Sequence, residues 1–144
     1  MKKNTFKQRE KDWRVGNIVY QVLVDRFAPS ENFENKKSQY SSPRKLRNWN
    51  ELPTRGNYLD DARVWSHEVD FWGGDLKSLE EKIDYIQNLK IDVLYLNPIF
   101  SSLTNHKYDT WDYSVIDHLF GTRKDLKRLA DKVHSLKMKI ILDG

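Results

Sequence analysis

The chain has 144 residues, a formal net charge of +4 and no cysteine. This length can bury the hydrophobic core of one domain, and the missing cysteine excludes disulfides, cysteine-ligated zinc and a thiol nucleophile. Aromatic residues make up 12% of the chain, which is too many for a disordered protein.

The N-terminus is basic. Residues 1–11 contain five Lys or Arg and one Glu, and we interpret residues 1–14 as a solvated arm, because nucleic-acid binders cluster their charge on one face. No apolar stretch follows the first lysines, so no secretory signal is visible, and no apolar run approaches the roughly 18 residues of a membrane span. We therefore expect a cytoplasmic protein that binds neither nucleic acid nor a membrane.

Three aliphatic and β-branched runs predict buried, parallel strands at residues 18–24, 91–96 and 138–142. Residues 27–74, between the first two, show no sustained period and are rich in Asn, Ser, Pro and Gly. A loop of this length is usually functional or disordered, and its scattered aromatic residues argue against disorder. We therefore expect it to be functional.

Two helices are predicted between the strands. Apolar residues at 76, 79, 83, 86 and 89 repeat with helical spacing after Asp75, which is a good N-cap. Thr122 and Asp125 form a capping-box pattern before a second helix, and residues 97–121 form a second loop. Strands that alternate with amphipathic helices predict the α/β class with a parallel sheet.

Polar residues follow each predicted strand: Asp25, Asn97 and Asp143. In parallel α/β proteins ligands bind at the carboxyl ends of the strands, so these ends predict a site. Neither nucleotide-binding fingerprint is present. The two glycines in residues 71–76 (FWGGDL) allow a phosphate site, but we favour a tight turn into the capped helix.

Residues 105–113 (NHKYDTWDY) are the densest group of chemistry-bearing side chains. A metal site made of His106, Asp109 and Asp112 has little support, because no zinc-type histidine spacing is present. A sugar site would stack the aromatic rings on a pyranose and bind its hydroxyls with Asp and His. The composition equally fits an ordinary loop packed on the edge of the sheet.

Four blocks resemble, in order, the N-terminal third of the catalytic domain of the alpha-amylase superfamily, glycoside hydrolase family 13. They are residues 19–27 (VYQVLVDRF), 71–100, 105–113 and 140–144 (IILDG), and they look most like the amylopullulanase, neopullulanase and cyclomaltodextrinase group. The resemblance implies that residues 15–144 are strands 1–3 of a (β/α)8 TIM barrel, with a long loop after strand 1. The family hydrolyses or transfers α-1,4 and α-1,6 glucosidic bonds with retention, so the implied partner is an α-glucan or maltooligosaccharide.

The resemblance implies substrate-binding roles for four residues. Tyr108 matches the tyrosine that stacks on the sugar next to the scissile bond, and His106 matches the histidine that binds the same sugar. Asp112 matches an acidic residue that supports the loop, and Asp143 matches the first Asp of the family's first signature region. Trp111 departs from the pattern, since relatives usually have a small residue there.

The resemblance assigns no catalytic residue to this chain, because the family's nucleophilic Asp, acid/base Glu and third Asp follow strands 4, 5 and 7, beyond residue 144. Retaining hydrolysis needs two carboxylates about 5–5.5 Å apart. We therefore expect a fragment, from a truncated or split gene or an incomplete gene prediction, that shows no turnover alone.

No cofactor is required by this chemistry, but some relatives bind calcium in the loop after the first strand. Asn32, Asn35 and Asp75 are the candidate ligands here, since calcium takes oxygen ligands, although the family's Asp and Asn spacing is not well kept and Pro29 falls inside this stretch. Two alternatives stay open. One is a non-catalytic carbohydrate-binding remnant that keeps Tyr108 and His106, and the other is a complete small α/β protein with an unrelated ligand, which the uncovered sheet edges disfavour.

Overall fold

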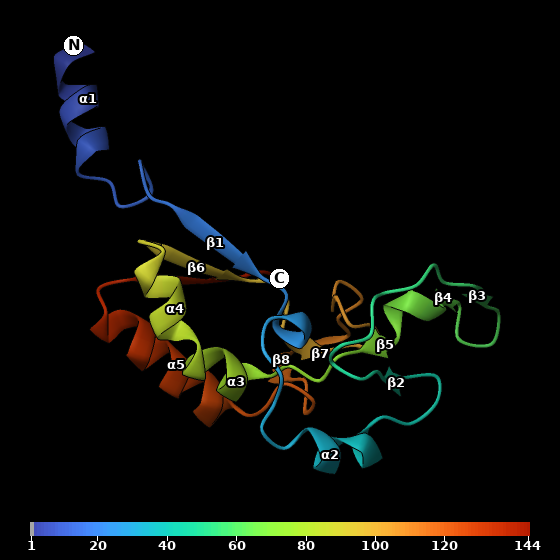
Figure 1. The fold of residues 1–144 in the computed structure, drawn as a ribbon. Helices are drawn as coiled ribbons and strands as arrows, with labels where there is room; N and C mark the ends of the chain where they lie inside the picture. The colour runs from blue at the N-terminus through green and yellow to red at the C-terminus, as the bar shows by residue number, and fades with distance from the viewer. Residues whose placement is uncertain (1) are drawn as a thin grey trace.

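Three parallel strands form the central sheet of the computed structural model, which describes residues 2–144 (Figure 1). Their order across the sheet is β1 (Val19–Val22), β6 (Val93–Leu96) and β9 (Lys139–Leu142). Gln21 lies beside Tyr95, and Tyr95 beside Ile141. The predicted strands and their parallel pairing are confirmed. β1 is shorter than predicted because the chain turns into a 3₁₀ helix at Val24–Arg26.

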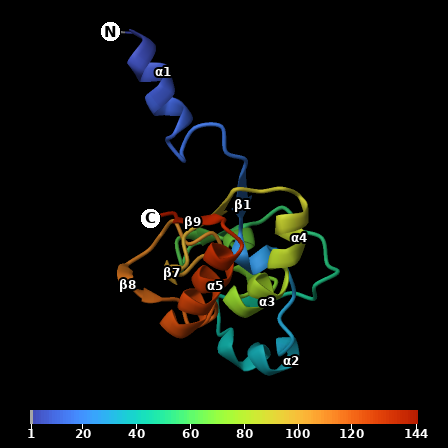
Figure 2. The same cartoon turned by 90° about the vertical axis from the view of Figure 1, so that its left-hand side faces the viewer.

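Three helices pack against one face of this sheet (Figures 1 and 2). They are α3 (Leu76–Glu81), α4 (Ile83–Asn88) and α5 (Arg123–Ser135). Asp75 caps α3 by accepting a 2.7 Å hydrogen bond from the Ser78 N–H, and the predicted capping box of α5 is present. The single helix predicted after Asp75 is interrupted at Lys82, whose ψ of 6° departs from helical geometry.

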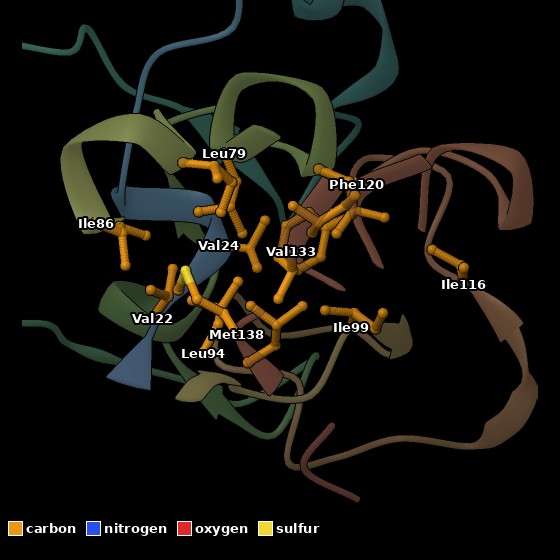
Figure 3. Close-up of a cluster of buried hydrophobic side chains, with 14 of the residues drawn as sticks. Val22, Val24, Leu79, Ile86, Leu94, Ile99, Ile116, Phe120, Val133 and Met138 are labelled. Atoms are coloured by element: carbon orange, nitrogen blue, oxygen red, sulfur yellow. The ribbon is translucent and has the colours of Figure 1, made fainter. Parts of the chain in front are cut away.

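The hydrophobic core fills the space between the sheet and these helices (Figure 3). Val22 and Leu94 from the strands meet Leu79, Ile86 and Val133 from the helices, and all five are nearly or fully buried. The prediction of buried strands is wrong for β1 and β9, whose Val19 and Leu142 are 53% and 41% exposed. A short aliphatic run shows that a strand is apolar, but it does not show whether both faces are covered.

The long loop between β1 and α3 is ordered into short elements. It contains α2 (Phe33–Lys36), 3₁₀ helices at Lys37–Gln39 and Ser66–Glu68, and strands β2 (Lys45–Leu46), β3 (Tyr58–Leu59), β4 (Val64–Trp65) and β5 (Asp70–Phe71). β2 pairs with β5 in parallel, and β3 pairs with β4 as a hairpin. The second loop holds the antiparallel pair β7 (Phe100–Ser101) and β8 (Asp112–Ile116). Aromatic anchors such as the buried Phe71 hold this region on the core.

The N-terminal arm contains helix α1 (Lys2–Glu10), which projects away from the sheet (Figure 1). The sequence did not predict this helix, because KKNTFKQRE has no apolar periodicity. Met1 lies outside the described residues. Within residues 2–144, no helix has both the length and the apolar character that crossing a membrane requires.

The glycine pair forms the favoured tight turn, and this gives a prediction. A Cβ on Gly74 would lie 2.3 Å from the Val24 carbonyl oxygen, a backbone atom that cannot move aside cheaply. We expect Gly74→Ala to lower the free energy of unfolding by about 1–3 kcal/mol. Urea denaturation followed by circular dichroism measures this loss, and a variant as stable as the parent chain would contradict the packing described.

Candidate functional site

Tyr108, His106 and Asp143 form a cluster at the carboxyl end of the sheet. The Tyr108 hydroxyl donates a 2.7 Å hydrogen bond to Oδ2 of Asp143, the residue that follows β9. The Tyr108 ring stacks on the His106 imidazole with centroids 5.8 Å apart, and Tyr108 is 56% exposed. The structure thus brings together three predicted site residues from two distant segments and leaves the tyrosine ring open to a ligand.

The hydrogen bonds of this cluster determine which of its atoms donate and which accept. The bond to Asp143 raises the pKa of Tyr108 to about 12, so the hydroxyl stays a donor at neutral pH. Nδ1 of His106 accepts from the Tyr108 N–H at 3.1 Å, which places the proton of a neutral imidazole on Nε2. Nε2 lies 3.4 Å from Oε1 of Glu68. Sequence reasoning missed Glu68, which belongs to a 3₁₀ helix in the irregular loop.

The neighbouring sheet edge adds further polar groups. Asn97, at the end of β6, accepts a 2.7 Å hydrogen bond from Nε2 of Gln21 on β1. Burial and the nearby Asp143 carboxylate raise the pKa of Tyr95, so this hydroxyl also stays protonated. An aromatic face beside several hydroxyl, amide and carboxylate groups can stack on the apolar face of a sugar ring and bind its hydroxyls.

The loop that bears Tyr108 is held by buried contacts of this chain. Nδ2 of Asn105 donates to the carbonyl oxygens of His67 and Asp70 at 2.7 and 2.8 Å. Nζ of Lys107 lies 2.6 Å from Oδ2 of Asp117, and the side chains of this ion pair are 0% and 2% exposed. Burial lowers the pKa of Lys107, although Asp117 opposes this shift. No sequence pattern marks Lys107 as a buried residue, so the ion pair was missed.

Two other acidic residues of the loop serve the loop itself. Burial alone would raise the pKa of Asp109, but hydrogen bonds from Thr104 and the Leu103 N–H outweigh it and lower that pKa. Asp112 accepts from the N–H and hydroxyl of Ser114 at 2.8 and 2.6 Å. No hydrogen bond within residues 2–144 joins Asp112 to Tyr108, His106 or Asp143. In the described part of the chain, no three His, Asp or Glu side chains are grouped as a metal site.

The three candidate calcium ligands do not fit a metal ion. Oδ2 of Asp75 accepts a 2.8 Å hydrogen bond from Nζ of Lys36, so an ammonium group lies where an ion would contact this carboxylate. Asn32 and Asn35 are exposed. None of the hydrogen bonds found among the described residues joins either asparagine to Asp75. Asp75, the one buried candidate, thus already has a cation partner that the chain itself supplies.

Asp25 does not share the open site that its position after β1 predicted. Its carboxylate accepts the N–H groups of Trp72 and Gly73 at 2.9 and 3.0 Å, and it is fully buried. The Gly74 N–H donates to the Asp25 carbonyl oxygen. These amides are satisfied within the protein, so the turn offers no anion site. Asp25 instead fixes the turn that leads into α3.

The buried carboxylate predicts a pH dependence of stability. Burial raises the pKa of Asp25 from 3.8 to about 6, so the folded chain holds this proton more tightly than the unfolded chain. Its contribution to stability is fully present below the ordinary pKa and is lost as the pH rises through about 6. We expect the difference in free energy of unfolding between the parent chain and Asp25→Asn to fall from roughly pH 4.5 to 6.5. Urea titrations at both pH values measure it, and a constant difference would contradict the assignment.

Comparison with known proteins places this chain in a family. The family model "Alpha amylase, catalytic domain" matches residues 21–144. The amylopullulanase of Thermoanaerobacterium saccharolyticum is 43% identical, over 92% of this chain and 11% of the relative. The cyclomaltodextrinase of Thermoanaerobacter pseudethanolicus is 35% identical, over 92% of this chain and 20% of the relative. The chain thus spans only a tenth to a fifth of these relatives.

Solved structures agree with the sequence relatives. The type III pullulan hydrolase from Thermococcus kodakarensis superposes with a TM-score of 0.74 at 32% identity, over 91% of this chain and 23% of that one. The cyclic alpha-maltosyl-(1→6)-maltose hydrolase from Arthrobacter globiformis gives a TM-score of 0.70 at 32% identity, over 92% of this chain and 25% of that one. These matches confirm the resemblance predicted from the four sequence blocks. The chain belongs to the alpha-amylase family, glycoside hydrolase family 13.

Proposed function

We propose that this chain is the part of a retaining α-glucan hydrolase that binds the sugar next to the scissile bond. In this proposal β1, β6 and β9 are the first three strands of a (β/α)8 barrel, and Tyr108 and His106 contact one glucosyl unit. The observation that carries the proposal is the stacked Tyr108–His106 pair, joined to Asp143 at the strand end. Relatives named as amylopullulanase and cyclomaltodextrinase support an α-glucan or maltooligosaccharide as the ligand.

The contacts of the acidic side chains support a second inference, that these 144 residues bind the sugar and do not hydrolyse it. A retaining mechanism needs a nucleophilic carboxylate and a second carboxyl group about 5–5.5 Å away. Asp25 is buried against backbone amides, and Asp109 accepts hydrogen bonds from its own loop. Asp143 is bonded to Tyr108. The loop that bears Tyr108 is fixed by its own buried contacts, which favours the binding-only alternative for the chain in isolation.

Titration with maltopentaose tests this function. Trp111 lies in the same loop and is 66% exposed, so its fluorescence can report a bound sugar. We expect a saturable change with maltopentaose, none with the β-linked cellopentaose, and no release of reducing sugar. Equal responses to the two sugars, or none, would contradict the binding proposal. Released reducing sugar would contradict the inference that the chain alone is inactive.

A further inference from the structure

Lys36, the last residue of α2, holds a charged group inside the long loop. The residue is only 8% exposed. Its ammonium donates three hydrogen bonds, to the Gly73 carbonyl at 3.1 Å, to Oδ2 of Asp75 at 2.8 Å and to the Leu119 carbonyl at 3.0 Å. An ammonium group has three donors, so every donor of Lys36 is used.

The oxygens around Lys36 are of the kind that bind a hard cation. Two backbone carbonyls and one carboxylate converge from different parts of the chain, and calcium is held by such groups at 2.3–2.6 Å. Here the three oxygens lie 2.8–3.1 Å from a nitrogen, which is hydrogen-bond spacing. The single charge of the ammonium balances the single charge of Asp75. A metal ion here would displace Nζ and leave a buried ammonium without partners, which is strongly unfavourable.

The three contacts join segments that are far apart in sequence. Gly73 belongs to the turn before α3, Asp75 caps that helix, and Leu119 precedes α5. Asp75 also accepts the Ser78 N–H, so one carboxylate serves both the helix cap and the ammonium. The long loop is therefore tied to both helices through one positive charge.

We propose that the Lys36 ammonium takes the place of a structural metal cation, so that the loop between β1 and α3 keeps its fold without calcium. The inference is independent of sugar binding. It replaces the candidate site of Asn32, Asn35 and Asp75 with a cation that the chain itself supplies.

Thermal unfolding of the parent chain with a chelator and with calcium is the first test. We expect the same melting temperature in roughly 5 mM EGTA and in roughly 5 mM calcium chloride. A calcium ion that bound the folded chain and not the unfolded chain would raise the melting temperature. A melting temperature that falls in EGTA or rises with calcium would overturn the proposal. This test uses the parent chain alone, so its result does not depend on whether a variant folds.

A pair of neighbouring substitutions is the second test. Lys36→Met removes the buried charge, while Lys37→Met removes an exposed lysine that pairs with Glu34. We expect Lys36→Met to lower the melting temperature by about 8 °C or more, or to prevent folding, and Lys37→Met to change it by less than about 2 °C. Equal melting temperatures for the two variants would overturn the role of Lys36.

Discussion

Replacing Lys107 by Met is expected to lower the free energy of unfolding by about 3–5 kcal/mol. The substitution leaves the carboxylate of Asp117, whose side chain is 2% exposed, without its closest cation. It also removes a cation that lies 5.2 and 4.8 Å from the ring centres of Phe71 and Phe120. Urea denaturation followed by circular dichroism measures the loss.

Two control variants separate the buried charge from other effects. Lys127→Met breaks an exposed pair with Asp131, and exposed pairs contribute about 0–1 kcal/mol. Combining Lys107→Met with Asp117→Asn removes both charges at nearly constant volume, and we expect it to recover part of the stability. If Lys107→Met is no more damaging than Lys127→Met, the buried pair does not hold this loop.

Replacing Tyr108 by Ala is expected to weaken maltopentaose binding at least tenfold. An aromatic ring that stacks on a sugar contributes about 1.5–3 kcal/mol to the binding free energy through the apolar surface it buries. A loss of about 1.4 kcal/mol weakens the affinity tenfold. Tyr108→Phe keeps the ring and loses the hydroxyl bonded to Asp143, so we expect a smaller loss. Isothermal titration calorimetry measures the affinities of the parent chain, Tyr108→Ala and Tyr108→Phe for maltopentaose.

Tyr85 supplies a matched control for Tyr108. It lies on α4 and is 55% exposed, against 56% for Tyr108, so both substitutions remove a similar exposed ring. Tyr85→Ala is expected to bind maltopentaose like the parent chain. If Tyr85→Ala weakens binding as much as Tyr108→Ala, the contact with sugar is non-specific.

Local sequence signals were enough to predict the framework of the fold. Asp75 and Thr122 act as caps within three residues of their partners, so a short pattern contains the whole interaction. The aliphatic runs and the helical spacing of apolar residues set the three strands and α5 in the same way. The resemblance to a family then supplied the three residues that the structure brings together at the strand ends.

The buried side chains that hold the loops around the site depend on contacts between separate segments of the chain. No local sequence pattern contains such contacts. Lys36 and Lys107 look like ordinary surface lysines, because lysine is rarely buried without a partner, and the partners Leu119 and Asp117 lie 83 and 10 residues away. Asp25 was expected to face a ligand, but it is bonded to amides 47 and 48 residues away. These pairings follow from the path of the irregular loops, which have no period from which to predict them.

Nuclear magnetic resonance of the isotope-labelled chain locates the maltopentaose site directly. We expect the backbone amide shifts to move with sugar concentration mainly in residues 103–113 and at Asp143. The amides of α3 and of α5 are expected to stay in place. Shifts centred on those helices, or no shift at saturating sugar, would contradict the assignment of the glucosyl site to Tyr108 and His106.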